Sequence, residues 1–380
     1  MIREELRKHK FIVFGAEHYN PLGIVRSLGE EGIRPIVIII DGGPPLTSKS
    51  KYIQRVHHVK DRNDGLCILV GKYIDKECPA FIYASDDTLV SLLDAHYDEL
   101  KGKFYFFNAG EKGKLEYYLN KKNIGDLAVK CGLNFLETQV VNNGDIPEKI
   151  NYPIITKPID STAIGWKRDM YICNNEKELK EAFTKIHSPI VMIQRYIIKK
   201  NEYCLEGFSC NHGHDLFISI QSSYNYKLPM SYSPYMTVNN FNNMNNVFPG
   251  LQAMFREIGF EGIFEVEFLV AEDGKLYFGE INFRNSTWSY ASTCAGMNLP
   301  ILWADSMLLG HQVDNCRKEI GEPGFTAMVE LTDFKERVIK SKYSIIKWIK
   351  DLKKCKCRYY IGRNDWRPVL SMLESRIIKS

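Results

Sequence analysis

Residues 262–284 read GIFEVEFLVAEDGKLYFGEINFR, and this stretch decides the fold prediction. Two apolar runs flank Asp273-Gly274, a dipeptide that is typical of a tight hairpin turn. We therefore expect antiparallel strands over 263–270 and 275–281. Further runs of strand type precede them, so the hairpin is predicted to belong to a larger antiparallel sheet.

Oxygen-bearing side chains recur at every second position of this hairpin. Glu265 and Glu267 stand on the first strand, and Glu280 and Asn282 on the second. Residues two apart on a strand point to one face, so Glu267, Glu280 and Asn282 are expected to gather above the sheet. Hard oxygen ligands of this kind suit Mg²⁺ that also touches substrate phosphates. The alternative is an ordinary solvated strand face.

Composition sets the broad class of protein. The chain has 380 residues, of which 44% are hydrophobic and 25% charged, as in soluble proteins of two or three packed subdomains. No apolar run approaches the roughly 20 residues that a membrane span needs. The ten cysteines are scattered without a CxxC pair, and the N-terminus is charged. We therefore expect free thiols in the cytoplasm.

Charge is nearly balanced overall but uneven along the chain. The net charge of +4 is not the signature of a dedicated nucleic-acid binder. Residues 335–380 carry 14 basic and 4 acidic residues, a net charge of +10. A solvated basic segment is the favoured interpretation, and contact with a membrane surface or an acidic partner is the alternative. Within it, residues 344–352 predict an amphipathic helix, which more commonly docks on the protein body than on a membrane.

The first part of the chain alternates strands and helices with short connections, which predicts an open parallel α/β domain over residues 1–112. The expected strands cover 11–15, 33–40, 80–84 and 103–107, and the helices cover 21–32 and 89–100. Ligands of such sheets bind outside the carboxyl ends of the strands, where Asn20, Ser85 and Asp86 lie. Helix capping is the alternative role for Ser85 and Asp86.

The middle of the chain changes texture. We expect helices over 114–132, 176–187, 247–259 and 298–309, and strands over 152–157, 190–198, 202–209, 217–221 and 236–238. The proposed division is one subdomain over 113–193, a second with the metal site over 194–310, and a basic extension over 311–380.

Two lysines on separate elements are candidates for holding a polyphosphate. Lys121 lies on the first of these helices, and Lys157 ends a strand before a loop of small residues. Two ammonium groups would neutralise phosphate charge, and Ser161 and Thr162 of the loop could close over the phosphates. Taken singly, either lysine is more commonly just solvated.

An apolar strand that turns into a loop follows at Gln194-Arg-Tyr-Ile197. Its backbone offers N–H and C=O groups to an adenine edge, and the carboxylate of Glu202 could bind two ribose hydroxyls. Read alone, the segment is an amphipathic strand.

The order of these features resembles the ATP-grasp superfamily of carboxylate–amine ligases, and within it the branch that contains D-aspartate ligase. The resemblance covers residues 1–310 and implies a preATP-grasp domain followed by a two-subdomain ATP-grasp fold. It implies ATP phosphates on Lys121 and Lys157. It also implies adenine on Gln194 and the main chain of Tyr196 and Ile197, and ribose on Glu202.

The resemblance further implies two Mg²⁺ ions, with Mn²⁺ as an alternative, on Glu267, Glu280 and Asn282. Arg284 would face an acyl-phosphate or the acceptor carboxylate. Two positions depart from the pattern: Asn120 stands where relatives often have Asp, and Glu265 where many have Arg. The cation at the reacting centre is therefore expected to be Arg284 or Lys167.

The segment after the hairpin, NSTWSYASTCAGMNLP over 285–300, follows the metal strand directly. Ser286, Thr287, Trp288 and Tyr290 are expected to line an acceptor pocket, and a plain connection to the next helix is the alternative. The implied function is an ADP-forming ligase that joins a carboxylate, of an amino acid, to an amine through an acyl-phosphate. The partners are small molecules, with a homodimer as in relatives. A kinase-like or carboxylase-like phosphoryl transfer and a non-catalytic nucleotide binder are the alternatives.

Overall fold

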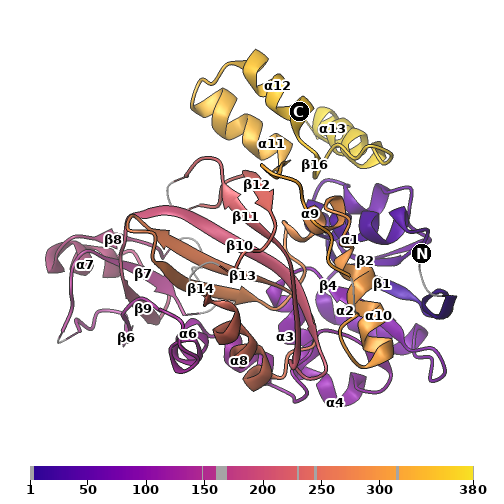
Figure 1. Cartoon of the computed structure of the whole chain (residues 1–380), viewed down its shortest axis with the longest axis horizontal. Coiled ribbons are helices and arrows are strands. Elements are labelled where there is room, and N and C mark those ends of the chain that lie inside the picture. The colour runs from indigo at the N-terminus through magenta and orange to yellow at the C-terminus, as the bar shows by residue number, and fades with distance from the viewer. Residues whose placement is uncertain are drawn as a thin grey trace.

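The computed structural model describes residues 4–147, 149–159, 169–228, 231–243, 246–313 and 316–379. Its described strands form three sheets, of five, four and seven strands. Figure 1 shows the small four-stranded sheet and the five-stranded N-terminal sheet on opposite sides of the long, curved seven-stranded sheet. This arrangement confirms the prediction of a parallel α/β part followed by antiparallel sheets.

The N-terminal sheet is parallel, with strand order β3-β2-β1-β4-β5. Its strands are β1 (Phe11–Ala16), β2 (Ile36–Ile40), β3 (Arg55–Val59), β4 (Ala80–Ala84) and β5 (Phe104–Tyr105). The helices are α1 (Tyr19–Glu30), α2 (Arg62–Lys72), α3 (Asp87–Ala95) and α4 (Tyr97–Leu100). The sequence prediction missed β3 and α2, because β3 reads RVHHV and lies at the sheet edge, where polar residues replace the apolar run of an inner strand.

The small sheet is antiparallel, with strand order β6-β9-β7-β8. Its strands are β6 (Thr138–Asn142), β7 (Ile154–Pro158), β8 (Ile172–Cys173) and β9 (Ile190–Arg195), and α7 (Glu176–Phe183) packs on it. The predicted boundary between residues 193 and 194 falls inside β9, so Gln194 belongs to this sheet and the change of sheet follows Arg195.

The large sheet has strand order β14-β13-β10-β11-β12-β15-β16. Its strands are β10 (Lys199–Cys210), β11 (Asp215–Tyr224), β12 (Tyr235–Asn239), β13 (Gly262–Ala271), β14 (Leu276–Asn282), β15 (Phe325–Met328) and β16 (Cys357–Arg358). The predicted hairpin is present as β13 and β14, with Glu267 opposite Glu280 and Glu265 opposite Asn282. The helices beside this sheet are α8 (Phe248–Ile258), α9 (Ser289–Cys294) and α10 (Leu299–Leu309).

The helix predicted over 114–132 is instead two helices, α5 (Lys114–Leu119) and α6 (Lys121–Lys130). Asn120 between them has extended backbone angles, and its side chain accepts hydrogen bonds from the backbone N–H groups of Lys122 and Asn123. Asn is a strong N-cap, so it starts a new helix where apolar spacing alone predicts continuity. The helix expected over 89–100 also divides, at His96, although the His96 side chain makes no capping hydrogen bond.

The chain after residue 310 is not a separate appendage. It supplies β15 and β16 to the large sheet, together with α11 (Glu330–Asp333), a π-helix (Phe334–Lys340), α12 (Ile345–Lys354) and α13 (Arg367–Lys379). The buried guanidinium of Arg26 on α1 pairs with Asp365, with Nε and Oδ2 3.2 Å apart. This contact joins the last part of the chain to the N-terminal domain.

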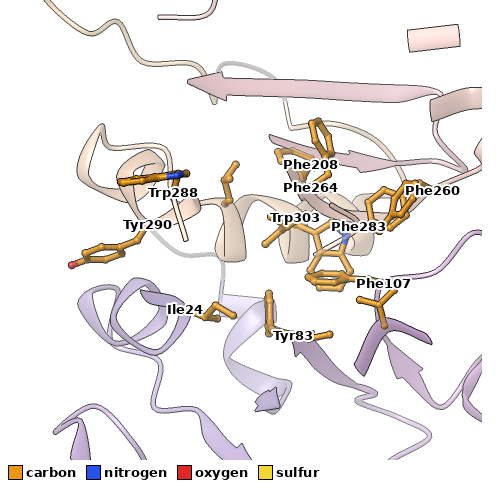
Figure 2. Packing of buried hydrophobic residues seen from close by; sticks show 14 of the residues in the cluster. Ile24, Tyr83, Phe107, Phe208, Phe260, Phe264, Phe283, Trp288, Tyr290 and Trp303 are labelled. Carbon is orange, nitrogen blue, oxygen red and sulfur yellow. The ribbon is translucent and has the colours of Figure 1, made fainter. Parts of the chain in front are cut away.

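Aromatic packing fixes the N-terminal domain against the large sheet. Trp303 of α10 is fully buried, and its ring lies 4.9 Å from Phe107 and 5.4 Å from Tyr83, measured between centroids. The hydroxyl of Tyr83 donates to the carbonyl of Pro300 at 2.8 Å. Figure 2 shows these rings between the N-terminal strands and α10. The geometry between the two domains is therefore set by a continuous core.

Candidate active site

A cavity of about 230 Å³ lies where the N-terminal domain, the α5–α6 helices and the large sheet meet. Its polar lining comes from elements far apart in the sequence. The ionisable and amide side chains around it are Asp87, Lys121, Glu265, Glu267, Glu280, Asn282 and Arg284. The apolar part includes Trp288, Ile281, Ile124 and the rings of Tyr118, Tyr224 and Tyr232.

The predicted metal ligands come together on β13 and β14. Because residues directly opposite in an antiparallel pair share a face, the register brings Glu267 beside Glu280 and Glu265 beside Asn282. The amide of Asn282 donates from Nδ2 to Glu265 at 2.9 Å and reaches Glu267 at 3.4 Å. A bulge follows Glu267, and opposite it a Cβ on Gly279 would make a tight contact, 3.0 Å from the Glu267 carbonyl oxygen.

Lys121 reaches this cluster from the first position of α6. Asn120 caps the helix, and the backbone N–H of Lys121 donates to the carbonyl of Ile159, just beyond β7, at 2.9 Å. The ammonium group forms an ion pair with Glu280. Burial alone would lower the pKa of Lys121, but Glu280 and Glu267 raise it overall, while Lys121 holds the pKa of Glu280 below its usual value. Asn120, which stands where relatives often have Asp, thus still caps the helix that carries Lys121.

Lys157 lies on β7 of the small sheet and is not among the described residues that line the cavity. Its Nζ donates to Oε1 of Gln194 on the neighbouring strand at 2.9 Å, and Nε2 of Gln194 donates to Thr138 at 3.0 Å. Burial, with Lys121 nearby, lowers the pKa of Lys157 to about 8. An ammonium that loses hydration without gaining a carboxylate partner is poised to accept an anion.

The predicted adenine and ribose residues lie at the junction of the two sheets. Gln194 lies on β9. The backbone N–H of Tyr196 already donates to the carbonyl of Pro153 at 2.9 Å, so the Tyr196 carbonyl is the backbone group that remains for a ligand. Ile197 follows before β10 begins, and Glu202 on β10 is buried and paired with Lys199.

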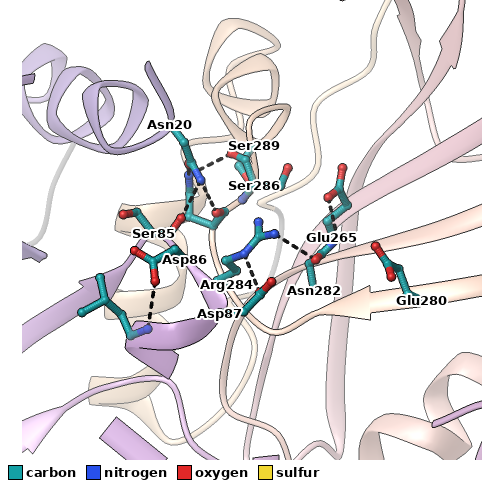
Figure 3. A network of polar contacts seen from close by, with 12 residues as sticks. Asn20, Ser85, Asp86, Asp87, Glu265, Glu280, Asn282, Arg284, Ser286 and Ser289 are labelled. Carbon is teal, nitrogen blue, oxygen red and sulfur yellow. Dashed lines mark hydrogen bonds and ion pairs between the residues drawn. The ribbon is translucent and has the colours of Figure 1, made fainter. Parts of the chain in front are cut away.

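Arg284 connects the large sheet to the N-terminal domain. Its Nε donates to Asp87 at 2.6 Å, and its Nη2 donates to Oδ1 of Asn282 at 3.0 Å (Figure 3). Asp87 is the first residue of α3, which follows β4 directly. The sequence analysis stopped at the preceding Asp86, although the same strand end pointed to both aspartates.

Asn20, Ser85 and Asp86 do not line this cavity among the described residues, contrary to the prediction that they bind substrate. Nδ2 of Asn20 donates to the carbonyls of Ser85 and Asn285, at 3.0 and 2.8 Å. The Ser85 hydroxyl donates to the carbonyl of Phe14 at 3.2 Å. Asp86 caps α3 by accepting from the Leu89 N–H at 2.9 Å. Their polar groups hold the strand ends together, because buried polar groups need partners.

The segment after the hairpin divides its residues between two roles. Thr287 and Trp288, both predicted for an acceptor pocket, line the cavity, and their contact with an acceptor stays a prediction. The Ser286 hydroxyl instead donates at 2.7 Å to Glu206, and the Ser289 hydroxyl donates to the other oxygen of Glu206 at 2.6 Å. Ser286 therefore holds the segment after β14 against β10.

Glu206 is a site residue that the sequence analysis missed. It is fully buried on β10 and stands opposite Glu265 on β13. Burial raises its pKa, and burial together with Glu206 raises that of Glu265. The signal was available, because Glu206 lies four residues after Glu202 and so shares its strand face.

The carboxylates of the cavity outnumber the nearby cations. Burial and the neighbouring Glu280 and Glu265 raise the pKa of Glu267 well above its usual value. Across the described residues, no three His, Cys, Asp or Glu side chains are arranged to hold a metal ion by themselves. Two carboxylates with the Asn282 amide oxygen remain a donor set that suits a hard cation, which would relieve the crowding.

Three predicted residues, Ser161, Thr162 and Lys167, lie outside the described residues. So does most of the loop that follows Lys157.

No model of a known protein family matches the chain. Over 143 residues it is 28% identical to the D-alanine–D-alanine ligase of Fusobacterium nucleatum subsp. nucleatum. That match covers 36% of this chain and 47% of the relative, so the chain spans about half the length of the curated relative that it matches.

Solved structures resemble the chain over most of its length. The L-amino acid ligase from Bacillus licheniformis has a TM-score of 0.61 and 15% identity, over 79% of this chain and 74% of that one. The N5-carboxyaminoimidazole synthetase from Staphylococcus aureus has a TM-score of 0.64 and 16% identity, over 90% and 88%. A biotin carboxylase from Campylobacter jejuni has a TM-score of 0.64 and 15% identity, over 81% and 72%.

These proteins are ATP-grasp enzymes, the superfamily that the sequence of this chain resembles. The chain has the ATP-grasp fold, with an N-terminal α/β domain before the two ATP-grasp subdomains. The narrower resemblance to the branch with D-aspartate ligase stays a prediction.

Proposed function

We propose that the protein is an ADP-forming ligase that joins a carboxylate, of an amino acid, to an amine through an acyl-phosphate. One observation carries the proposal: Lys121, Arg284 and the acidic cluster of β13 and β14 converge on one cavity in an ATP-grasp fold. The D-alanine–D-alanine ligase and the L-amino acid ligase, whose names state this kind of reaction, support it.

ATP would lie between the two sheets. Lys157 and Lys121 would bind its phosphates, and Gln194 with the main chain of Tyr196 and Ile197 would hold adenine. Glu202 would bind the ribose hydroxyls. An N5-carboxyaminoimidazole synthetase with ADP and a biotin carboxylase domain with MgADP have similar folds, which supports a nucleotide at this junction.

The reaction would proceed in two displacements. An oxygen of the substrate carboxylate attacks the γ-phosphorus of ATP, the bond from that phosphorus to the bridging oxygen breaks, and ADP leaves. The amine then attacks the acyl carbon, inorganic phosphate leaves with its electron pair, and the amine nitrogen loses a proton. Lys121, Lys157 and Arg284 would offset the repulsion between the anionic reactants. Trp288 would shield the acyl-phosphate from water.

Glu267, Glu280 and Asn282 would hold two Mg²⁺ ions, or Mn²⁺ in their place. When bound, such ions neutralise phosphate charge and hold the reacting oxygens in line. Ser161, Thr162 and Lys167 stay candidates for contacts with the phosphates. A cytoplasmic location and a homodimer complete the proposal.

A phosphate-release assay tests the function. The protein with Mg²⁺ and ATP is screened against pairs of amino acids and small amines. We expect release that requires both an acid and an amine, with an amide product seen by mass spectrometry. Glu280→Gln serves as the control with strongly reduced activity. Release that needs no amine across all pairs would contradict the ligase.

A carboxylase-like phosphoryl transfer is the second candidate, because the fold is also that of a biotin carboxylase. Bicarbonate would then stimulate phosphate release without an amino-acid acceptor. The same assay with and without bicarbonate separates the two reactions.

A further inference from the structure

Helix α12 exposes a row of isoleucines at the outer edge of the molecule. The side chains of Ile345, Ile346 and Ile349 are 52%, 66% and 41% exposed. Figure 1 shows α12 at the top of the view, on the far side of the large sheet from α6 and α8. This surface is therefore separate from the candidate active site.

The other face of α12 is already docked, so the exposed isoleucines are not waiting for a place in the core. Trp348 is buried, its ring lies 5.0 Å from Phe334, and its Nε1 donates to Asp333 at 2.8 Å. Asp351 accepts from Arg337 at 2.7 Å. The helix is held by these contacts with its exposed face outward, which confirms docking on the body for one face alone.

Four exposed lysines lie on the same helix: Lys347, Lys350, Lys353 and Lys354. Within the described part of the chain, none of the four forms an ion pair, because the one acid of the helix, Asp351, is taken up by Arg337. We call these lysines together with Ile345, Ile346 and Ile349 the α12 surface. It combines exposed apolar side chains with positive charges that no ion pair neutralises among the described residues.

This composition favours one occupant. Protein interfaces are enriched in aromatic residues and arginine and depleted in lysine, whereas the exposed part of α12 has aliphatic residues and lysines. A second copy docked symmetrically on this face would bring its lysines against these, and like charges across an interface are unfavourable. Aliphatic residues rimmed by lysine are typical of helices that lie in the interface of an anionic lipid bilayer.

We propose that the α12 surface docks the protein on an anionic membrane, with the isoleucines at the acyl boundary and the lysines among the headgroups. The docking does not depend on the proposed enzymatic activity. Among the described residues, no helix has the length and hydrophobicity of a membrane span.

Vesicle flotation with the full-length protein tests the proposal. One set of vesicles contains equal parts of phosphatidylglycerol and phosphatidylcholine, and the other contains phosphatidylcholine alone. We expect the protein to float with the anionic vesicles and to be released by high salt, because exposed charges are screened. Failure to float with the anionic set, or equal flotation with both sets, would overturn the proposal.

Two variants assign the binding to α12. Lys350→Gln/Lys353→Gln/Lys354→Gln should weaken the partitioning by about fivefold per lysine, and so roughly a hundredfold together. Ile345→Ser/Ile346→Ser/Ile349→Ser should weaken it about tenfold by removing the inserted apolar area. The matched controls are Lys177→Gln/Lys180→Gln on α7 combined with Lys185→Gln just after it, and Val129→Ser on α6, a residue that is 57% exposed. Flotation that is unchanged in both α12 variants would place the contact elsewhere and overturn the proposal.

Folding and self-association are measured beside flotation. Thermal unfolding identifies a variant that fails to fold, and Ile346→Ser, at the most exposed of the three positions, then replaces the triple variant. Sedimentation of the unmodified protein without lipid should show no association through this face. A dimer that Ile346→Ser dissociates would mean that a second copy covers the surface, and would also overturn the proposal.

Discussion

The two groups of residues predicted to bind ATP differ in how their charges are satisfied. The large-sheet wall means Lys121, Glu280, Arg284 and Asp87, and the small-sheet wall means Lys157 and Gln194. On the large-sheet wall, Glu280 pairs with Lys121 and Arg284 pairs with Asp87, so each cation has a carboxylate partner. On the small-sheet wall, Lys157 donates to the neutral amide of Gln194. Lys121 and Lys157 are both half-buried, yet the pKa of Lys121 is raised and that of Lys157 is lowered to about 8.

The difference indicates a division of labour. The large-sheet wall holds its groups in place before any ligand arrives, as electrostatic catalysis requires. The small-sheet wall leaves one cation without a carboxylate, and an anionic ligand would restore what burial removed. Substitutions on the first wall should therefore affect turnover, and substitutions on the second should affect ATP binding.

The largest expected effect is at Arg284. In Arg284→Gln, the guanidinium that faces the cavity is lost, and kcat/KM should fall about a thousandfold, in the range of other cations that stabilise phosphoryl transfer. Steady-state phosphate release with a fixed acid and amine measures it. Asp87→Asn keeps the guanidinium and removes its anchor, so it should lose much less. Equal losses in the two variants would mean that the ion pair matters structurally.

Glu280→Gln should lower kcat about a hundredfold, because it removes a donor oxygen and frees Lys121 from its ion pair. The Mg²⁺ concentration at half-maximal rate should rise as well, which a purely structural role would not produce. Glu257→Gln, a surface glutamate paired with Lys130, is the matched control. An unchanged Mg²⁺ dependence would contradict the assignment of Glu280 as a ligand.

At Lys157 the effect should appear in binding. Its ammonium is present below its pKa of about 8 and is lost above it, so ATP affinity of the free protein should fall as the pH rises through about 8. Calorimetric titration across this range should show the fall, and Lys157→Arg, which stays protonated, should flatten it. Lys157→Met should weaken ATP binding about tenfold at neutral pH. A pH profile of the unmodified protein that matches that of Lys157→Arg would show that Lys157 does not titrate there.

The smallest expected effect on activity is at Glu206, which accepts hydrogen bonds from the segment that follows β14. Glu206→Gln should raise KM for the amine a few fold, because the Ser286 and Ser289 hydroxyls lose one of the two carboxyl oxygens that accept from them. Burial raises the pKa of Glu206 above its ordinary value of 4.5. The unmodified protein should therefore lose stability relative to Glu206→Gln as the pH rises above about 4.5. Melting temperatures at acid and neutral pH measure this difference, and a constant difference would contradict it.

Local patterns predicted most elements of the site. The Asp-Gly turn and the two-residue period of β13 and β14 were sufficient to bring Glu267, Glu280 and Asn282 to one face. The same reasoning failed at Asn20 and Ser85. Ser85 directly follows β4 and Asn20 lies in the first turn of α1, but the polar groups of both bond to neighbouring backbone. Position at a strand end follows from sequence, whereas the direction of a small polar side chain depends on its buried neighbours.

The sequence by itself determined the hairpin, part of the order of strands and helices, and the kinds of side chain available for phosphate and cation. Tertiary structure alone decided which charges meet. Asp87 and Arg284 are 197 residues apart in the chain, and Glu206 and Ser286 are 80 apart. The physical reason is that periodicity acts through neighbours along one element, while ion pairs and buried hydrogen bonds arise when packing brings separate elements within a few ångströms.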